Sequence, residues 1–83
     1  PAVNIHPSIF RSNTTVIADP ELASRYSLKV VLFDLGGRVV KEIEVPPHGR
    51  SVLSRDGLTA GTYFFSVLAN DTRVRSGKLI ITD

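Results

Sequence analysis

The chain holds two histidines, and any acid–base chemistry at neutral pH would begin with them, because an ordinary imidazole titrates near pH 6.5. Each stands beside proline, in His6-Pro7 and in Pro46-Pro47-His48. A hydrolytic site needs a nucleophile, a base and an orienting carboxylate held together in a cleft. Neither histidine belongs to a recognisable nucleophile or metal motif. We therefore interpret both as solvated loop residues and expect no enzyme activity.

The carboxylates do not form a metal site in the sequence either. Asp19, Asp34, Asp56 and Asp71 lie in four separate turn segments, without the alternating spacing of a calcium-binding loop. Their side chains are suited to accept hydrogen bonds from nearby backbone N–H groups. There is no cysteine, so thiolate metal sites and disulfides are unavailable. We expect no cofactor and no bound metal.

Composition narrows the remaining classes of function. The formal charge is +2 over 83 residues, and the cations are scattered among acids, which disfavours a nucleic-acid partner. No apolar stretch approaches the roughly 20 residues of a membrane-spanning helix. The N-terminus lacks the basic-then-apolar order of a secretory signal. We expect residues 1–83 to be one domain, and the start at Pro1 suggests a piece of a larger protein.

The elements that carry these residues are predicted to be strands. Apolar residues recur with period two in short runs rich in Val, Ile, Thr, Tyr and Phe. Asp19-Pro20-Glu21-Leu22 can open a helix, for which we expect one turn. About seven strands with turn signals at this spacing predict an all-β, immunoglobulin-like antiparallel β-sandwich. The predicted strands are residues 3–5, 14–18, 26–33, 38–45, 50–53, 62–69 and 72–82.

Alternation also predicts which side chains face the core. The predicted inner residues of two central strands are Leu28, Val30, Leu32, Tyr63, Phe65 and Val67. Apolar residues also occur on the opposite faces, at Val31, Phe33, Phe64 and Leu68. Such a patch either marks a partner site or is covered by neighbouring segments. The alternation also predicts that Arg73 and Arg75 share one face, and with Lys78 they form either a basic stripe or ordinary edge-strand protection.

Three phrases join strands to glycine turns. They are residues 32–40 (LFDLGGRVV), 57–67 (GLTAGTYFFSV) and 77–81 (GKLII). Gly37 and Gly61 permit tight transitions between strand and turn, and Asp34 can cap its turn. Tyr63 supplies a large core ring with a polar tip. These four positions are expected to specify the fold.

In their order and spacing, the phrases resemble the C-terminal sorting domains of the type IX secretion system of Bacteroidetes. Related immunoglobulin-like modules of hook-capping proteins and secreted enzymes share the first two phrases, but usually carry Trp-Asp-Gly before the second. Here Ser54-Arg55-Asp56-Gly57 has no tryptophan, which favours the sorting domain. The resemblance covers nearly the whole chain.

The resemblance implies a non-catalytic sorting signal that the type IX outer-membrane translocon recognises. It implies a cargo N-terminal to the domain in a larger secreted protein, periplasmic transit, and cleavage by a sortase-like peptidase before surface display or release. Partner recognition is expected through the sheet surface and last hairpin, at Arg38, Gly77, Lys78, Leu79, Ile80 and Ile81. Arg38 could instead pair with Asp34 or Glu42. The alternative function is an accessory domain that stabilises a neighbouring catalytic domain.

Overall fold

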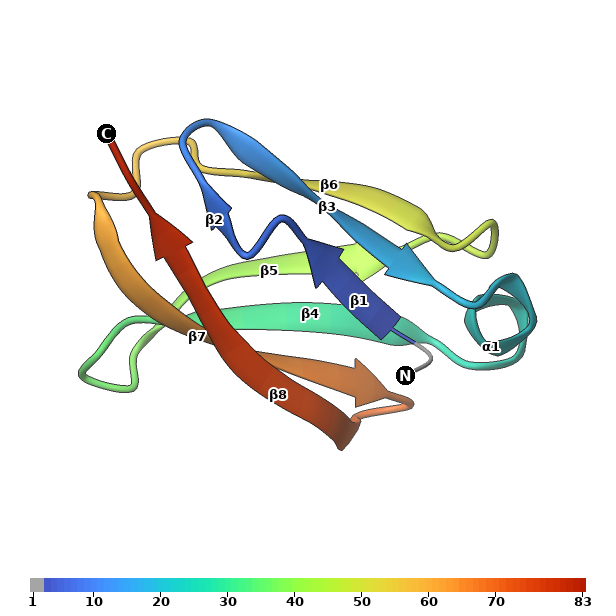
Figure 1. The fold of residues 1–83 in the computed structure, drawn as a ribbon. Helices are drawn as coiled ribbons and strands as arrows, with labels where there is room; N and C mark the ends of the chain where they lie inside the picture. The colour runs from blue at the N-terminus through green and yellow to red at the C-terminus, as the bar shows by residue number, and fades with distance from the viewer. Residues whose placement is uncertain (1–2) are drawn as a thin grey trace.

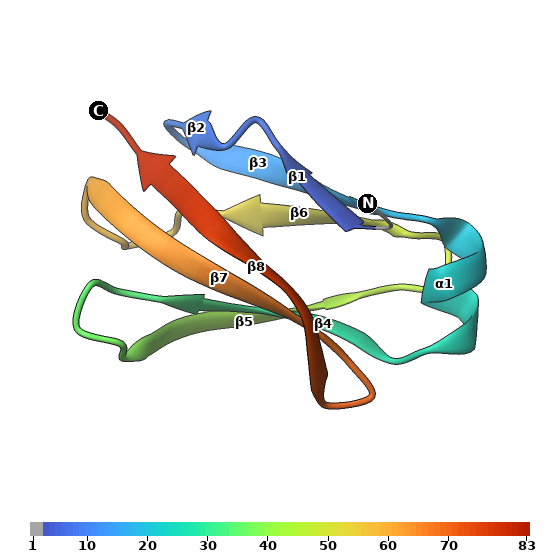
Figure 2. The ribbon, with the colours of Figure 1, turned by 60° about the horizontal axis from the view of Figure 1, so that its bottom comes forward.

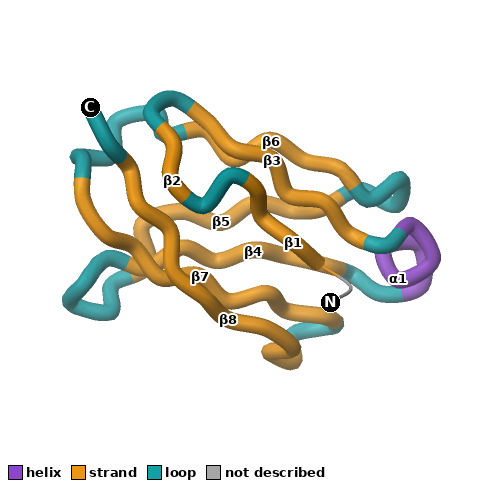
Figure 3. The backbone as a smooth tube through the Cα atoms, viewed as in Figure 1, coloured by secondary structure: helices purple, strands orange, loops and turns teal. Residues whose placement is uncertain are grey.

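Eight strands and one short helix make up residues 3–83, the part of the chain that the computed structural model describes (Figures 1 and 3). The prediction of an all-β domain is confirmed. The elements are β1 (Val3–His6), β2 (Ile9–Phe10), β3 (Asn13–Ala18), α1 (Pro20–Arg25), β4 (Leu28–Phe33), β5 (Val39–Val45), β6 (Arg50–Ser54), β7 (Gly61–Ala69) and β8 (Thr72–Ile81).

The strands form two sheets that lie face to face, and α1 closes one end of the sandwich (Figure 2). One sheet has the order β1-β3-β6 and the other the order β2-β8-β7-β4-β5. All pairs are antiparallel except β2 with β8, which is parallel. The predicted immunoglobulin-like antiparallel β-sandwich is confirmed, and the parallel β2–β8 pair is the one addition to it within residues 3–83. β2 was not predicted because two residues are too few to show an alternating pattern.

The core lies between the sheets, where the predicted inner faces of β4 and β7 are confirmed. Leu28, Val30 and Leu32 are buried, as are Tyr63, Phe65 and Val67, and Val16 and Leu53 meet them from the three-stranded sheet. Full burial of a side chain of this size contributes about 1.5–3 kcal/mol relative to exposure. With no disulfide available, this thin apolar layer and the strand ladders hold the fold together.

Helix α1 is longer than the single turn that the sequence predicts. Asp19 is the N-cap residue, and its carboxylate accepts a hydrogen bond from the Glu21 N–H at 3.0 Å. Pro20 occupies the first helical position, where its missing N–H costs nothing. The helix extends because Leu22 packs on the core and Ala23 is buried in it. It delays the start of β4 to Leu28, two residues later than predicted.

Two irregularities in strand pairing decide which side chains share a face. The register shifts between Leu32 and Phe33 in the β4–β5 pair, and again between Val67 and Leu68 in the β7–β8 pair. At the second shift Arg75 lies opposite the buried Val67, whereas Arg73 lies opposite Leu68 on the outer face. The prediction that Arg73 and Arg75 share one face was wrong, since a bulge interrupts the alternation on which it depended.

Candidate functional site

An apolar row crosses the outer face of the five-stranded sheet. Phe33 of β4 lies opposite Val39 of β5 and Phe64 of β7, and Phe64 lies opposite Lys78 of β8. We call Val39, Phe33, Phe64 and Lys78 the outer row. Val39 and Phe64 keep 47% and 44% of their surface exposed. Opposed residues on neighbouring strands place their side chains in contact range, so the outer row is one continuous surface.

A turn closes one end of this surface. The Asp34 carboxylate accepts hydrogen bonds from the N–H groups of Gly36 at 3.0 Å and Arg38 at 2.9 Å. Gly37 adopts a φ of 86°, which favours glycine. The Arg38 N–H bond, together with the Gly36 N–H and the Arg38 charge, lowers the pKa of Asp34 below its ordinary value. Asp34 therefore holds the turn in its ionised form.

Arg38 pairs with Asp34 and not with Glu42. Its Nε lies 3.3 Å from Asp34 Oδ2, and its side chain is 82% exposed. Glu42 is instead 3.4 Å from Lys29. An exposed pair of this kind contributes little to stability. The Arg38 guanidinium is thus oriented at the end of the sheet while most of its surface stays open to solvent.

Between the turn and strands β7 and β8 lies a groove of about 630 Å³. Phe33 and Phe64 line its apolar part, Leu35 extends from the turn, and Ser76 and Lys78 line the side of β8. Leu35 is well exposed. The first and third sequence phrases therefore meet on one face of the molecule, although more than 35 residues of chain separate Leu35 from Lys78.

The last strand divides the predicted recognition residues between the two faces of the sheet. Lys78 and Ile80 lie opposite Phe64 and Thr62 on the outer face. Leu79 and Ile81 are buried in the core, with 1% and 2% of their surface exposed.

Gly77 also lies toward the core, because a Cβ placed on it would come within 2.7 Å of the Phe65 ring. The ring covers the glycine and leaves no room for a side chain. Of residues 77–81, only Lys78 and Ile80 present side chains to the outer face.

Residues 57–67 include Tyr63, which packs on the core side of β7, the strand that carries Phe64. The Tyr63 ring is buried, and its hydroxyl donates a hydrogen bond to the Thr59 carbonyl oxygen at 2.7 Å. Gly61 begins β7 with a φ of 151°. Tyr63 thereby fixes the segment that leads into β7, the strand that carries Phe64.

Comparison with known proteins identifies the family. The family described as "Secretion system C-terminal sorting domain" matches residues 4–82. This chain is a type IX secretion sorting domain. A sorting domain of this kind marks a protein for export to the cell surface or for secretion.

The fold of the sorting domain agrees with a solved structure. An immunoglobulin-like β-sandwich protein of the DUF3244 family from Bacteroides vulgatus superposes with a TM-score of 0.74, over 98% of this chain and 85% of that protein. The two sequences are 13% identical, so the likeness shows the fold alone. A search of curated proteins found no significant match.

Part of the outer face was not identified from the sequence. Val39 precedes a bulge in β5, which hides its alternation with the rest of the strand, and Leu35 lies in the turn itself. Conversely, Val31 lies on the outer face but is only 7% exposed, because it sits in a central strand between β5 and β7. The sequence left open whether the outer apolar residues are exposed or covered by neighbouring segments. Val31 is covered, whereas Phe64 is exposed.

The histidines and the groups that could bind a metal were also located in the structure of the sorting domain. His6 lies in β1 and not in a loop as predicted, and both it and His48 are exposed. Within residues 3–83, no three His, Cys, Asp or Glu side chains come together to hold a metal ion. Within the same range, no helix is long and apolar enough to cross a membrane.

Proposed function

We propose that this sorting domain is a non-catalytic C-terminal signal that docks on the type IX outer-membrane translocon through the outer row and the adjoining groove. The single observation that carries this proposal is the meeting of the 34–38 turn, Phe64 and Lys78 on one face. The domain would follow its cargo through the periplasm, and a sortase-like peptidase would then remove it.

The chemistry of this face suits protein recognition. Exposed Phe64 and Val39 offer apolar area, while Arg38 and Lys78 supply cations at its ends. Specific interfaces combine an apolar centre with a charged rim, and aromatic residues and arginine are enriched among their strongest contacts. The fitting partner surface is apolar and has carboxylates at its edge.

The residues of the last strand take two roles in this proposal. Lys78 and Ile80 contact the partner directly. Gly77, Leu79 and Ile81 act through the fold, because they face the core and keep β8 in register with β7. Within residues 3–83, no observation favours the alternative of an accessory domain for a neighbouring enzyme.

The test is export of a fluorescent reporter fused to residues 1–83 in a type IX-competent host. The double variant Phe64→Ser/Lys78→Glu changes only the outer row. A matched control, Val52→Ser/Arg50→Glu, likewise replaces one apolar residue by serine and one cation by glutamate, on exposed β6 residues of the three-stranded sheet. We expect the outer-row variant to reduce export at least tenfold and the control to change it less than twofold.

Folding of both variants is checked by circular dichroism and thermal melting of the isolated domains. Equal export of a folded outer-row variant and of the wild type would contradict the proposed docking face. Deleting residues 77–83 is a weaker test. The deletion removes Leu79 and Ile81 from the core, so lost export could arise from unfolding alone.

A further inference from the structure

Strand β8 has an edge that is mostly unpaired within residues 3–83. Its pairing with β7 runs the whole length of the strand, from Thr72 to Ile81. On its other side β2 pairs only with Ile80 and Ile81. An edge of this kind exposes backbone donors and acceptors to which another extended chain can add.

The hydrogen bonds to β2 show which backbone groups point to this edge. The Ile80 N–H donates to the Ser8 carbonyl at 2.8 Å, and the Thr82 N–H donates to the Phe10 carbonyl at 2.9 Å. Backbone groups of alternate residues along a regular strand point to the same side. Ser76 and Lys78 therefore direct their N–H and C=O groups toward the same edge as Ile80, beyond the end of β2.

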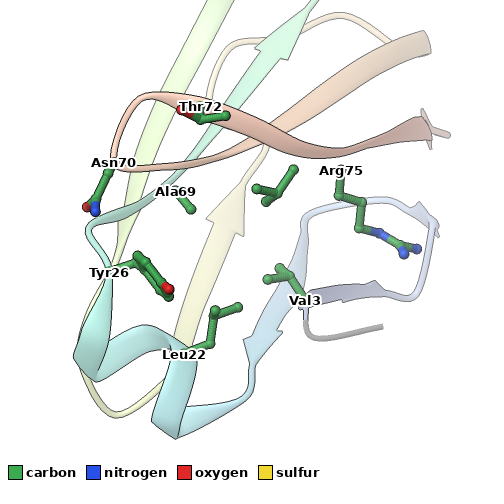
Figure 4. Close-up of a pocket in the computed structure, with 8 residues that line it drawn as sticks. Val3, Leu22, Tyr26, Ala69, Asn70, Thr72 and Arg75 are labelled. Atoms are coloured by element: carbon green, nitrogen blue, oxygen red, sulfur yellow. The ribbon is translucent and has the colours of Figure 1, made fainter.

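An apolar cleft of about 640 Å³ runs beside this edge, between β8 and Val3, the first residue of β1. Val3, Leu22, Tyr26 and Val74 are among its lining residues. Figure 4 shows Tyr26 and Arg75 at opposite ends, with Leu22 and Val3 between them. The cleft is thus apolar along its length and cationic at one end.

The charge of β8 has one sign. The strand carries Arg73, Arg75 and Lys78 and no acid. None of the ion pairs found in residues 3–83 involves these three cations. In addition, the Arg75 Nε is buried and has no hydrogen-bond partner among the residues that the structure describes. This edge therefore complements carboxylates.

We propose that the open edge of β8 binds an extended acidic peptide segment by strand addition. Side chains of the added strand alternate between the two faces of the sheet. Those on the inner face enter the cleft and reach Arg75, and those on the outer face bring carboxylates to Arg73 and Lys78.

A second copy of this chain is a poor occupant for the same edge. Pairing β8 with β8 would bring two sets of three like charges together, which is destabilising. The cations and the bulge thus discourage self-association and leave the edge open to a partner of opposite charge. The site is centred on Arg75 and the Ser76 backbone and shares Lys78 with the proposed translocon docking face, but none of the observations that support it depends on that docking.

The test uses the 83-residue chain, labelled with ¹⁵N, and a capped nine-residue peptide that alternates valine with glutamate except at its centre, where a glutamate replaces the valine. As an added strand, this peptide carries glutamates for Arg73 and Lys78 on one face, and valines with one central glutamate for Arg75 on the other. The matched control peptide has lysine in place of every glutamate. We expect the acidic peptide to bind saturably and to slow amide hydrogen exchange at Ser76 and Lys78 at least tenfold. The lysine peptide is expected to bind at least tenfold more weakly.

Variants separate strand addition from general attraction of charge. Ser76→Pro removes an edge N–H that does not take part in the ladder with β7, and Arg75→Gln removes the cation at the end of the cleft. Arg50→Gln removes a cation from the opposite sheet as a control. We expect losses in affinity of at least tenfold for Ser76→Pro and at least threefold for Arg75→Gln, and less than twofold for Arg50→Gln.

Several results would overturn the inference. They are absence of binding at millimolar peptide, equal affinity for the two peptides, protection confined to strands other than β8, or equal losses for Arg75→Gln and Arg50→Gln. If Ser76→Pro does not fold, two other results decide whether the peptide adds to β8. They are the exchange pattern of the wild type and the comparison of Arg75→Gln with Arg50→Gln. Phe64 and Lys78 are unchanged in all these variants, so the outcome is separate from that of the export test.

Discussion

Replacing Gly77 by alanine tests whether the last phrase of the sequence is needed for packing. In a strand, alanine is intrinsically favoured over glycine by about 0.5–1 kcal/mol, because glycine loses more backbone entropy on folding. At this position, however, an added Cβ would lie 2.7 Å from both Cε2 and Cζ of Phe65. Phe65 is 6% exposed and packs in the core. Its ring cannot move without disturbing its neighbours.

The steric cost of the added Cβ is expected to exceed the gain in strand propensity. Overpacking a core costs about 1–3 kcal/mol, which exceeds the propensity gain over most of that range. For a domain of this size, each 1 kcal/mol lowers the Tm by about 4–8 °C. At the middle of both ranges the net cost is about 1.25 kcal/mol. We therefore expect Gly77→Ala to lower the Tm by about 5–10 °C, measured by circular dichroism together with urea unfolding.

Two further variants make the test specific. Gly57→Ala is the control, since a Cβ there meets no atom within 4 Å, and its Tm is expected to stay close to that of the wild type. In a Phe65→Leu background, Gly77→Ala should cost less than it does in the wild type, because the clashing ring atoms are gone. A Gly77→Ala variant as stable as the wild type, or an unchanged cost without the ring, would show that the Phe65 ring does not exclude a side chain at residue 77.

Three other substitutions test the elements behind the outer face. Tyr63→Phe should lower the free energy of unfolding by about 0.5–1.5 kcal/mol in urea titrations, because the hydrogen bond to Thr59 is lost; no change would show that water replaces it. Leu79→Ala should cost about 2–5 kcal/mol in the same assay, since the side chain is fully buried; a smaller cost would place Leu79 outside the core. The pKa of Asp34 is lowered in the folded state, so its contribution is complete above the ordinary aspartate pKa of about 3.9 and is lost as pH falls through the folded value. Between pH 7 and pH 3 the Tm of the wild type should therefore fall further than that of Asp34→Asn, and equal falls would contradict the role of Asp34 in the turn.

Much of the fold was predictable because β4 and β7, the central strands of the larger sheet, alternate cleanly. The inner faces of β4 and β7 followed directly from period two, and Asp34 with two glycines indicated the turn between β4 and β5. Short or interrupted elements were not predictable in the same way. Strand β2 has two residues, and the final turn of α1 depends on the packing of Leu22 and Ala23 against strands distant in sequence.

The candidate site was predictable only in part, for a related reason. Phe33, Phe64 and Lys78 were each singled out, but their alignment in one row depends on the registers of β4, β7 and β8. The two register shifts brought Val39 into the row and placed Arg73 and Arg75 on opposite faces. A bulge adds one residue to one strand and reverses every face assignment beyond it, and alternation alone gives no sign of where that happens.

We propose that residues 1–83 are sufficient to direct export through the type IX translocon. The most direct measurement fuses a periplasmic fluorescent reporter to Pro1 and compares a competent host with its translocon-deficient mutant. We expect the reporter to appear outside the competent cells and to remain in the periplasm of the mutant. A folded, intact fusion that stays in the periplasm of both strains, or leaves both equally, would contradict it.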